Sequence, residues 1–265
     1  LFAKRNLIFT ILFSAYCVGC LALMSDFGTA LIFFVAFLCI AFLRTGDLPS
    51  IVMITAAAGF AGGIVLRFKP YVLARFAVWR HAWEYAQEGG YQQTRTMSAV
   101  ASGGLFGAGP EEAWLKYVGA ANTDLVFGVV SEEFGLLLAL CAAAAVILLG
   151  IYALRAAGRS RSSFYAIAAC ATAAMLVFQT TLNVLGSVDL LPLTGVTFPF
   201  VSMGGSSMLS CWGLLAYLQA AAPPPVSVKA APKAPAPAVK PPQATGFLDE
   251  LGVATDDIFG KEDAR

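Results

Sequence analysis

Residues 190–209 read LLPLTGVTFPFVSMGGSSML, a stretch in which prolines, glycines and small hydroxyl side chains interrupt otherwise apolar sequence. Proline and glycine both disfavour a continuous helix, so this stretch is not expected to form a regular membrane-spanning segment. Irregular backbone at membrane depth is tolerated only where it is buried in protein or lines a cavity. If the flanking sequence spans a membrane, the stretch is therefore expected to be buried or to border a cavity.

The composition indicates a membrane protein. Of the 265 residues, 58% are hydrophobic and 12% are charged, whereas soluble domains are about half apolar and about a quarter charged. The formal net charge of +1 provides no basic surface for phosphates, so no nucleic-acid partner is expected. The chain begins with Leu1 and has no cleavable signal-peptide pattern, so we expect an upstream portion to be missing.

Six apolar runs are long enough to cross a bilayer as helices, which takes about 20 residues each. The runs lie at residues 6–24, 28–43, 50–66, 134–154, 164–188 and 199–222. Because only the short break SDFG separates the first two runs, they could also form one long bent segment.

The positions of the basic residues favour six separate spans. Short cytoplasmic loops collect Lys and Arg. With six spans that start inside, all the basic residues beside the short connections fall on the cytoplasmic side; these are Lys4, Arg5, Arg44, Arg155, Arg159 and Arg161. With one span in place of the first two, Lys4 and Arg5 would lie opposite Arg44. The sequence therefore predicts an all-α polytopic membrane protein with about six transmembrane helices and both ends of the chain in the cytoplasm.

Two regions lie outside the predicted spans. Residues 67–133 contain three of the four tryptophans and the only histidine, His81, and are neither low-complexity nor strongly charged. We expect them to form a long ordered extracytoplasmic loop within a membrane core of residues 1–222. Residues 223–265 are a Pro/Ala-rich linker followed by an acidic tail, and we expect them to be disordered in the cytoplasm. The alternative for the tail is a short motif that folds on a cytoplasmic partner.

The six cysteines do not predict a metal site. All of them lie within the apolar runs, where a free cysteine behaves as a small hydrophobic residue. Cys17 and Cys20 form a CxxC pattern, but no further Cys or His follows at ligand spacing.

Acidic residues near the outer ends of the spans are candidates for function, because ionisable groups at membrane depth are costly and usually functional. Asp26 lies in the break between the first two runs. Asp124 lies between a glycine-rich stretch and the fourth run, where a carboxylate could meet a substrate that arrives through the lipid. For Glu132 and Glu133 we expect a structural role, in pairs with basic residues of the loop. The candidate bases are Lys69, Arg75, Arg80, Arg95 and Lys116.

Five motifs, in order, resemble those of the SEDS family of polytopic membrane proteins, whose members include FtsW, RodA and SpoVE. They are SDFGTA at 25–30, RFKPYVLARF at 67–76, GGYQQTRTMSAVASGGLFGAG at 89–109, NTDLVFGVVSEEFGLL at 122–137 and LPLTGVTFPFVSMGGSS at 191–207. The resemblance covers about residues 20–215 and implies the last six spans of a ten-span fold in the bacterial plasma membrane. The sequence departs from the family motifs at 119–122, Arg95 and Met203, around Asp124.

The resemblance implies a peptidoglycan glycosyltransferase that polymerises lipid II, a disaccharide-peptide on an undecaprenyl diphosphate carrier, for division, elongation or sporulation. By motif position, Asp124 would be the base that accepts the proton of the attacking sugar hydroxyl. Lys69 and Arg75 would bind the leaving diphosphate, and a divalent cation, Mg²⁺ or Mn²⁺, is a further source of positive charge. Asp26 would help to hold the cavity or a metal ion.

The resemblance also implies that the last motif lines the substrate cavity. Its candidate substrate-binding residues are Thr194, Ser202, Gly204, Gly205, Ser206 and Ser207. A class B penicillin-binding protein, a transpeptidase, is the implied partner. Two other functions stay open: a lipid II flippase, which would not depend on Asp124 as a base, and a catalytically silent scaffold that recruits the penicillin-binding protein.

Overall fold

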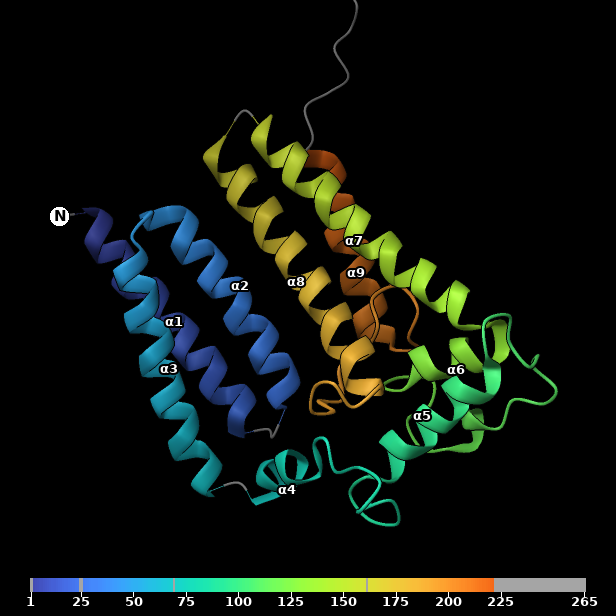
Figure 1. Cartoon of the computed structure of the whole chain (residues 1–265). Coiled ribbons are helices and arrows are strands. Elements are labelled where there is room, and N and C mark those ends of the chain that lie inside the picture. The colour runs from blue at the N-terminus through green and yellow to red at the C-terminus, as the bar shows by residue number, and fades with distance from the viewer. Residues whose placement is uncertain (1, 24–25, 69, 161, 222–265) are drawn as a thin grey trace, which may run out of the picture. The chain divides into compact units, whose positions relative to one another are not determined.

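The computed structural model describes residues 2–23, 26–68, 70–160 and 162–221. Within these ranges the chain forms helices, turns and loops, and no strand, as the predicted all-α fold requires (Figure 1). The helices are α1 (Phe2–Leu23), α2 (Phe27–Thr45), α3 (Leu48–Phe68), α4 (Pro70–Val78), α5 (Tyr91–Gly103), the 3-10 turn η1 (Leu115–Tyr117), α6 (Val126–Phe134), α7 (Leu136–Gly158), α8 (Ser163–Ser187) and α9 (Gly205–Ala221). The predicted linker and tail lie outside the described residues.

Each of the six predicted spans coincides with a long helix, namely α1, α2, α3, α7, α8 and α9. By length and composition, three of the described helices are able to cross a membrane: α2, α7 and α8. The number of six spans stays a prediction.

The last helix begins later than predicted. The sequence predicts a span from residue 199, but the backbone of 198–204 is irregular and α9 begins at Gly205. Phe200 has a φ of 64°, a left-handed conformation that an α-helix cannot contain. The expectation of irregular backbone in the quoted stretch is therefore confirmed. The irregular backbone continues to residue 204, past residue 199, at which the predicted span begins.

The break at Asp26 separates α1 from α2. Asp26 caps α2, because its Oδ1 accepts a hydrogen bond from the backbone N–H of Thr29 at 3.0 Å. The two helices pack against one another, as expected from two spans rather than one bent segment.

The centre of the structure is α8, which packs against α2, α5, α6, α7 and α9. Its contact with α7 is built from buried alanines, which let two backbones approach closely. They are Ala153 and Ala157 of α7 and Ala169 and Ala173 of α8. This packing fixes α8 as the support for the irregular segment that follows it.

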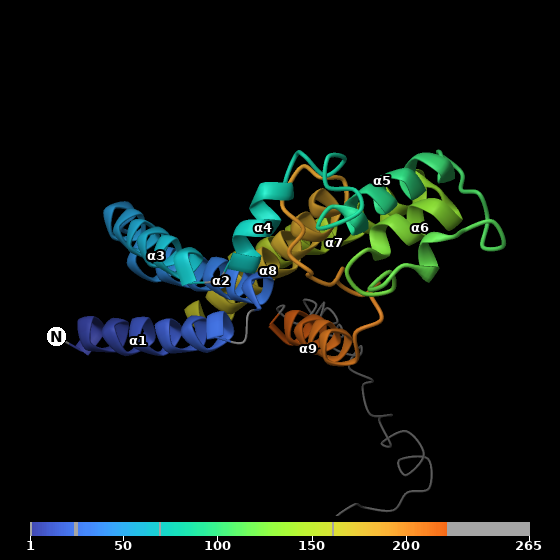
Figure 2. The ribbon, with the colours of Figure 1, turned by 90° about the horizontal axis from the view of Figure 1, so that it is seen from below.

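In its described part, the predicted outer loop (residues 67–133) contains helices α4 and α5, the 3-10 turn η1 and most of α6, with turns and irregular backbone between them. Helices α4, α5 and α6 lie at the same end of the long helices as segment 188–204 and the start of α2, whereas the end of α2, the start of α3, the end of α7 and the start of α8 lie at the opposite end (Figure 1). Figure 2 shows the irregular segment, in orange, beside α4 and α5. Residues from five parts of the sequence therefore meet at one end.

Candidate functional site

Asp124 lies in a tight turn that immediately precedes α6. Its backbone N–H donates to Ala120 O at 3.0 Å, and Ala120 has a left-handed φ of 63°. The turn holds the half-buried Asp124 carboxylate outside the regular helix. The predicted base is thus on a short, hydrogen-bonded turn.

The environment of Asp124 raises the pKa of its carboxyl group. The main cause is burial, which disfavours the charged form; the negative charge of Asp26 acts in the same direction. A hydrogen bond from the Thr123 side chain and the positive charge of Arg75 oppose the shift without cancelling it. A carboxylate with a raised pKa is a stronger proton acceptor than an ordinary aspartate.

Arg75 and Asp124 converge on Gly195. Nη1 of Arg75, on α4, donates to the backbone O of Leu193 at 2.8 Å. A Cβ placed on Gly195 would lie 3.2 Å from Oδ2 of Asp124 and 3.7 Å from Nη1 of Arg75. A predicted base and a predicted phosphate-binding cation are therefore brought to the same glycine.

The segment around Gly195 also packs closely on α2. A Cβ on Gly28 would lie 2.5 Å from Cγ2 of Val196 and 2.9 Å from the backbone O of Thr194. Only a glycine at this position lets α2 approach so closely. Because Gly28 follows the Asp26 cap, the start of α2 is fixed against the segment that carries Gly195.

Two amide side chains of α8 hold the segment from the other side. Nδ2 of Asn183 donates to the backbone O of Asp124 at 2.9 Å and to that of Val196 at 2.7 Å. Nε2 of Gln179 donates to the backbone O and to Oγ1 of Thr197 at 2.9 and 3.0 Å. The sequence analysis missed both amides. Polar residues at 179 and 183, four apart in an apolar helix, were the available signal.

The hydroxyls of the last motif differ in their surroundings. Ser202 is 2% exposed; its Oγ donates to Thr123 O at 2.6 Å and accepts the N–H of Phe198 at 2.7 Å. Ser207 Oγ lies 2.7 Å from Thr197 Oγ1, with either atom as donor. Oγ1 of Thr194 is buried without a hydrogen-bond partner among the described atoms. The hydroxyl of Ser202 therefore supports the site from inside the protein.

The remaining candidates of this motif lie at the start of α9. Gly205 and Ser206 are exposed, and Gly204 is half-buried just before the helix. The structure also brings two of the departures from the family motifs together, because the N–H of Met203 donates to Asn122 O at 2.8 Å. The turn of Asp124 and the last motif are thus joined by backbone as well as side-chain bonds.

Glu132 supports the outer loop, but with a different partner from the one predicted. It is 1% exposed, and its two carboxylate oxygens accept the backbone N–H groups of Trp114 and Leu115 at 3.1 and 2.9 Å. The sequence analysis predicted that Glu132 pairs with a basic side chain, but these two backbone amides are its partners. Glu133 is half-buried, and its backbone O accepts the N–H of Gly109. Lys69 lies outside the described residues.

A polar pocket of about 460 Å³ lies beside Arg75. Its other polar side chains come from the start of α5 and the turn before it: Glu88, Tyr91, Gln92 and Gln93. Gln93 also donates to Oδ1 of Asp189 at 3.0 Å, which ties α5 to the end of α8. Such a lining suits a group with several hydroxyls and amides.

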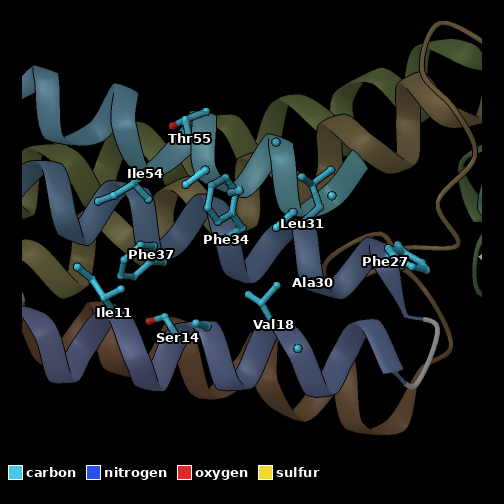
Figure 3. A pocket seen from close by; sticks show the side chains of 17 residues that line it. Ile11, Ser14, Val18, Phe27, Ala30, Leu31, Phe34, Phe37, Ile54 and Thr55 are labelled. Carbon is cyan, nitrogen blue, oxygen red and sulfur yellow. The ribbon is translucent and has the colours of Figure 1, made fainter. Parts of the chain in front are cut away.

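A second cavity, of about 690 Å³, is apolar and lies between α1, α2 and α3. Figure 3 shows Ile11 and Val18 of α1, Phe34 and Phe37 of α2 and Ile54 of α3 around it. This lining suits a hydrocarbon chain or an apolar helix, and it does not suit a polar headgroup.

The described part of the chain contains no group of three or more His, Cys, Asp or Glu side chains that could hold a metal ion. The charge of Asp26 acts on Asp124, and one or two carboxylates together with substrate phosphates are the usual ligands of Mg²⁺. A divalent cation at these carboxylates therefore stays a prediction.

Comparison with known proteins finds a family whose model covers all the described residues. The family model described as "Cell cycle protein", for FtsW, RodA and SpoVE, matches residues 2–223. The chain is 34% identical over 204 residues to the peptidoglycan glycosyltransferase RodA of Mycobacterium leprae, covering 76% of this chain and 43% of the relative. It is 30% identical over 218 residues to the probable peptidoglycan glycosyltransferase FtsW of Bacillus subtilis, covering 76% and 52%.

A solved structure shares the fold. A chain of a peptidoglycan synthase complex, described for the coordination of polymerization and crosslinking, superposes with a TM-score of 0.62 at 25% identity. The match covers 79% of this chain and 59% of that one. The present chain spans about half the length of the curated relatives that it matches.

Proposed function

Because the chain belongs to the family of FtsW, RodA and SpoVE cell cycle proteins, integral proteins of the plasma membrane, we propose that it forms the catalytic part of a peptidoglycan glycosyltransferase. Its substrate would be lipid II, which it would polymerise into glycan strands. The observation that carries the proposal is the convergence of Asp124 and Arg75 on Gly195.

Asp124 would act as the general base. The acceptor sugar hydroxyl attacks the anomeric carbon of the donor, a new C–O bond forms, and the bond from that carbon to the diphosphate oxygen breaks. A sugar hydroxyl is a poor nucleophile, so a carboxylate within hydrogen-bond reach would take its proton. The raised pKa of Asp124 supports this role, because it brings the base closer to the pH at which the enzyme works.

Arg75 would stabilise the diphosphate as it leaves. The leaving group gains negative charge while the bond breaks, and a guanidinium beside the reacting centre offsets that charge. We propose the same role for Lys69, the other cation that is expected to bind the leaving diphosphate. The divalent cation expected from the family resemblance stays a prediction, and no step is assigned to it.

The two cavities would receive different parts of the substrate. The polar pocket beside Arg75 has the hydrogen-bonding groups that a sugar or peptide headgroup needs. The apolar cavity between α1, α2 and α3 has the lining that a prenyl chain needs. Thr194, Gly204, Gly205, Ser206 and Ser207 would line the approach between the headgroup and the reacting centre.

The end that carries Asp124 would face outward. Arg44 and Arg159 lie beside the connections at the opposite end, which the positive-inside rule assigns to the cytoplasm (Figure 1). Both ends of the chain would then be cytoplasmic. A class B penicillin-binding protein would crosslink the product, in line with the described role of the solved complex. A cytoplasmic partner for the acidic tail stays a prediction.

The test is polymerisation of labelled lipid II by the intact membrane protein with its transpeptidase partner. We expect polymer from wild type, none from Asp124→Asn, and wild-type amounts from the matched control Asp47→Asn, an exposed carboxylate at the opposite end. If Asp124→Asn still makes polymer, Asp124 is not the base. If a folded wild-type complex makes no polymer, the proposed activity is wrong. Lipid II translocation without polymer would then identify a flippase, and recruitment of the penicillin-binding protein alone would identify a scaffold.

A further inference from the structure

Asn183 connects two distant parts of the candidate site. It lies on α8, it is 2% exposed, and its side-chain amide contacts the turn of Asp124 and the segment that carries Gly195. The two acceptors are the backbone carbonyls of Asp124 and Val196. One side chain thus bridges the residue proposed as base and the irregular segment opposite it.

Gln179 strengthens the same connection. Residues four apart on a helix share one face, so the amides of Gln179 and Asn183 both reach the irregular segment. They bind two consecutive backbone carbonyls, those of Thr197 and Val196. Since 196–197 belongs to no helix, these carbonyls obtain from α8 the partners that regular structure would otherwise supply.

The carbonyl bound by Asn183 belongs to the residue that carries the reactive carboxylate. A shift of the Asp124 backbone moves its carboxylate relative to Gly195, and Leu193, two residues before Gly195, holds the guanidinium of Arg75. Val196 meanwhile packs on Gly28 of α2. The bonds of Asn183 therefore join the base, the cation and α2 into one arrangement.

We infer that Asn183 is a positioning residue, which fixes Asp124 relative to Arg75 through the backbone carbonyls of Asp124 and Val196. The inference rests on the proposed function. Asn183 itself touches neither carboxylate nor substrate in this role. Its effect on the rate would come through geometry, since a displacement of about 1 Å in a reacting group can cost about 100-fold in rate.

The deciding variant is Asn183→Leu, which has a similar size and no amide. Ser187→Ala is the matched control, because Ser187 is buried one turn further along α8 and its hydroxyl donates to Asn183 O within the helix itself. Both variants would be made in the intact membrane protein with its partner. Measurements would be lipid II polymerisation over a range of pH, thermal unfolding, and amide hydrogen exchange at 122–128 and 193–198.

For Asn183→Leu we expect kcat to fall about 10- to 100-fold, with KM within about threefold of wild type. The acid limb of its pH–rate profile should move to lower pH, because a displaced Asp124 becomes better hydrated. Amide exchange should rise at 122–128 and 193–198. Ser187→Ala should change none of these.

The inference is overturned if Asn183→Leu keeps kcat within about threefold of Ser187→Ala, or if it loses activity with an unchanged acid limb and unchanged exchange at both segments. If Asn183→Leu does not unfold cooperatively, Asn183→Ser is judged by the same criteria, since the smaller residue cannot overpack the site. Failure of the proposed function is recognised separately, because wild type then makes no polymer whatever the exchange data show.

Discussion

At the scale of single residues, the site depends on a carboxyl group held where its charge is disfavoured. Asp124 is half-buried near Asp26, and burial outweighs the opposing effects of Thr123 and Arg75 on its pKa. A base for a sugar hydroxyl benefits from this environment. Protein stability does not, because ionising the group in the folded protein is harder than in the unfolded chain.

This conflict predicts opposite effects of pH on activity and stability. The folded pKa lies above the unfolded one, so the stability contributed by protonated Asp124 is complete below the unfolded pKa and is lost as pH rises through the folded pKa. Over the same window activity rises. The variant Asp124→Asn should lose activity. Its melting temperature should be higher than that of wild type, and the difference should grow as pH rises through that window. A melting-temperature difference that does not vary with pH would contradict the prediction.

Gly195 should tolerate no side chain. Its φ of 75° is left-handed, which costs about 1–2 kcal/mol for a residue with a Cβ. The added atom would also lie 3.2 Å from Oδ2 of Asp124 and 3.7 Å from Nη1 of Arg75. We predict that Gly195→Ala lowers kcat at least about tenfold, as expected for a displaced reacting group. Gly213→Ala on α9 is the control, because its Cβ would meet nothing within 4 Å. Polymerisation rates of the two variants would be compared. Equal rates would show that the close approach of Asp124 and Arg75 to Gly195 is unimportant.

At the scale of elements, the helices of the outer loop are held by contacts that are distant in sequence. Trp79 Nε1 donates to Leu190 O at 3.1 Å, and the N–H of Arg80 donates to Oδ1 of Asp189 at 3.1 Å. Together with the Gln93–Asp189 bond, these contacts fasten α4 and α5 to the end of α8. The irregular segment between α8 and α9 is thus held by the outer loop as well as by α8 itself.

Within that loop, Glu132 should be needed for the order of 110–117. Glu132→Gln keeps the shape but replaces one acceptor oxygen by a donor, so a buried amide of Trp114 or Leu115 loses its partner. Leaving such a group unsatisfied costs about 1–3 kcal/mol. We predict a lower melting temperature and faster amide exchange at 110–117. The control is Glu133→Gln, which changes the neighbouring, half-buried carboxylate and should leave the melting temperature and the amide exchange near wild type. If both variants lower the melting temperature equally, the effect comes from the loss of charge alone.

At the scale of the whole molecule, the described residues divide between two ends of the long helices. Asp124, Arg75 and the irregular segment lie at one end, and the connections beside Arg44 and Arg159 lie at the other (Figure 1). The candidate site residues and these two basic residues therefore lie at opposite ends of the long helices, which is the arrangement that the predicted topology requires.

The topology predicts which positions are accessible from outside an intact cell. Asp47, between α2 and α3, and Glu84, between α4 and α5, are both exposed and lie at opposite ends of the long helices. A cysteine at Glu84 should react with a membrane-impermeant maleimide in intact cells, whereas one at Asp47 should react only after lysis. The unsubstituted protein measures the background of its six native cysteines. The reverse pattern would invert the proposed orientation.

The sequence by itself predicted the helices and the membrane, and the family resemblance pointed to Asp124 as the candidate carboxylate. In a bilayer, an apolar run of about 20 residues satisfies its own backbone groups by forming a helix. The motif around Asp124 is contiguous in the chain. The predicted start of the last span at 199 is wrong. The overall hydropathy of the run extended the span across the glycines and serines at 202–207, and the left-handed backbone at Phe200 has no signature in side-chain hydropathy.

Only the tertiary structure decided which groups act together. Glu132 binds two backbone amides rather than a basic side chain, and Asn183 binds two backbone carbonyls 59 and 13 residues away. Every residue but proline carries the same N–H and C=O, so the sequence does not mark which of them a buried side chain will meet. That choice follows from how α2, α4, α5, α6 and α8 pack, and this packing brings Asp124, Arg75 and Gly195 together.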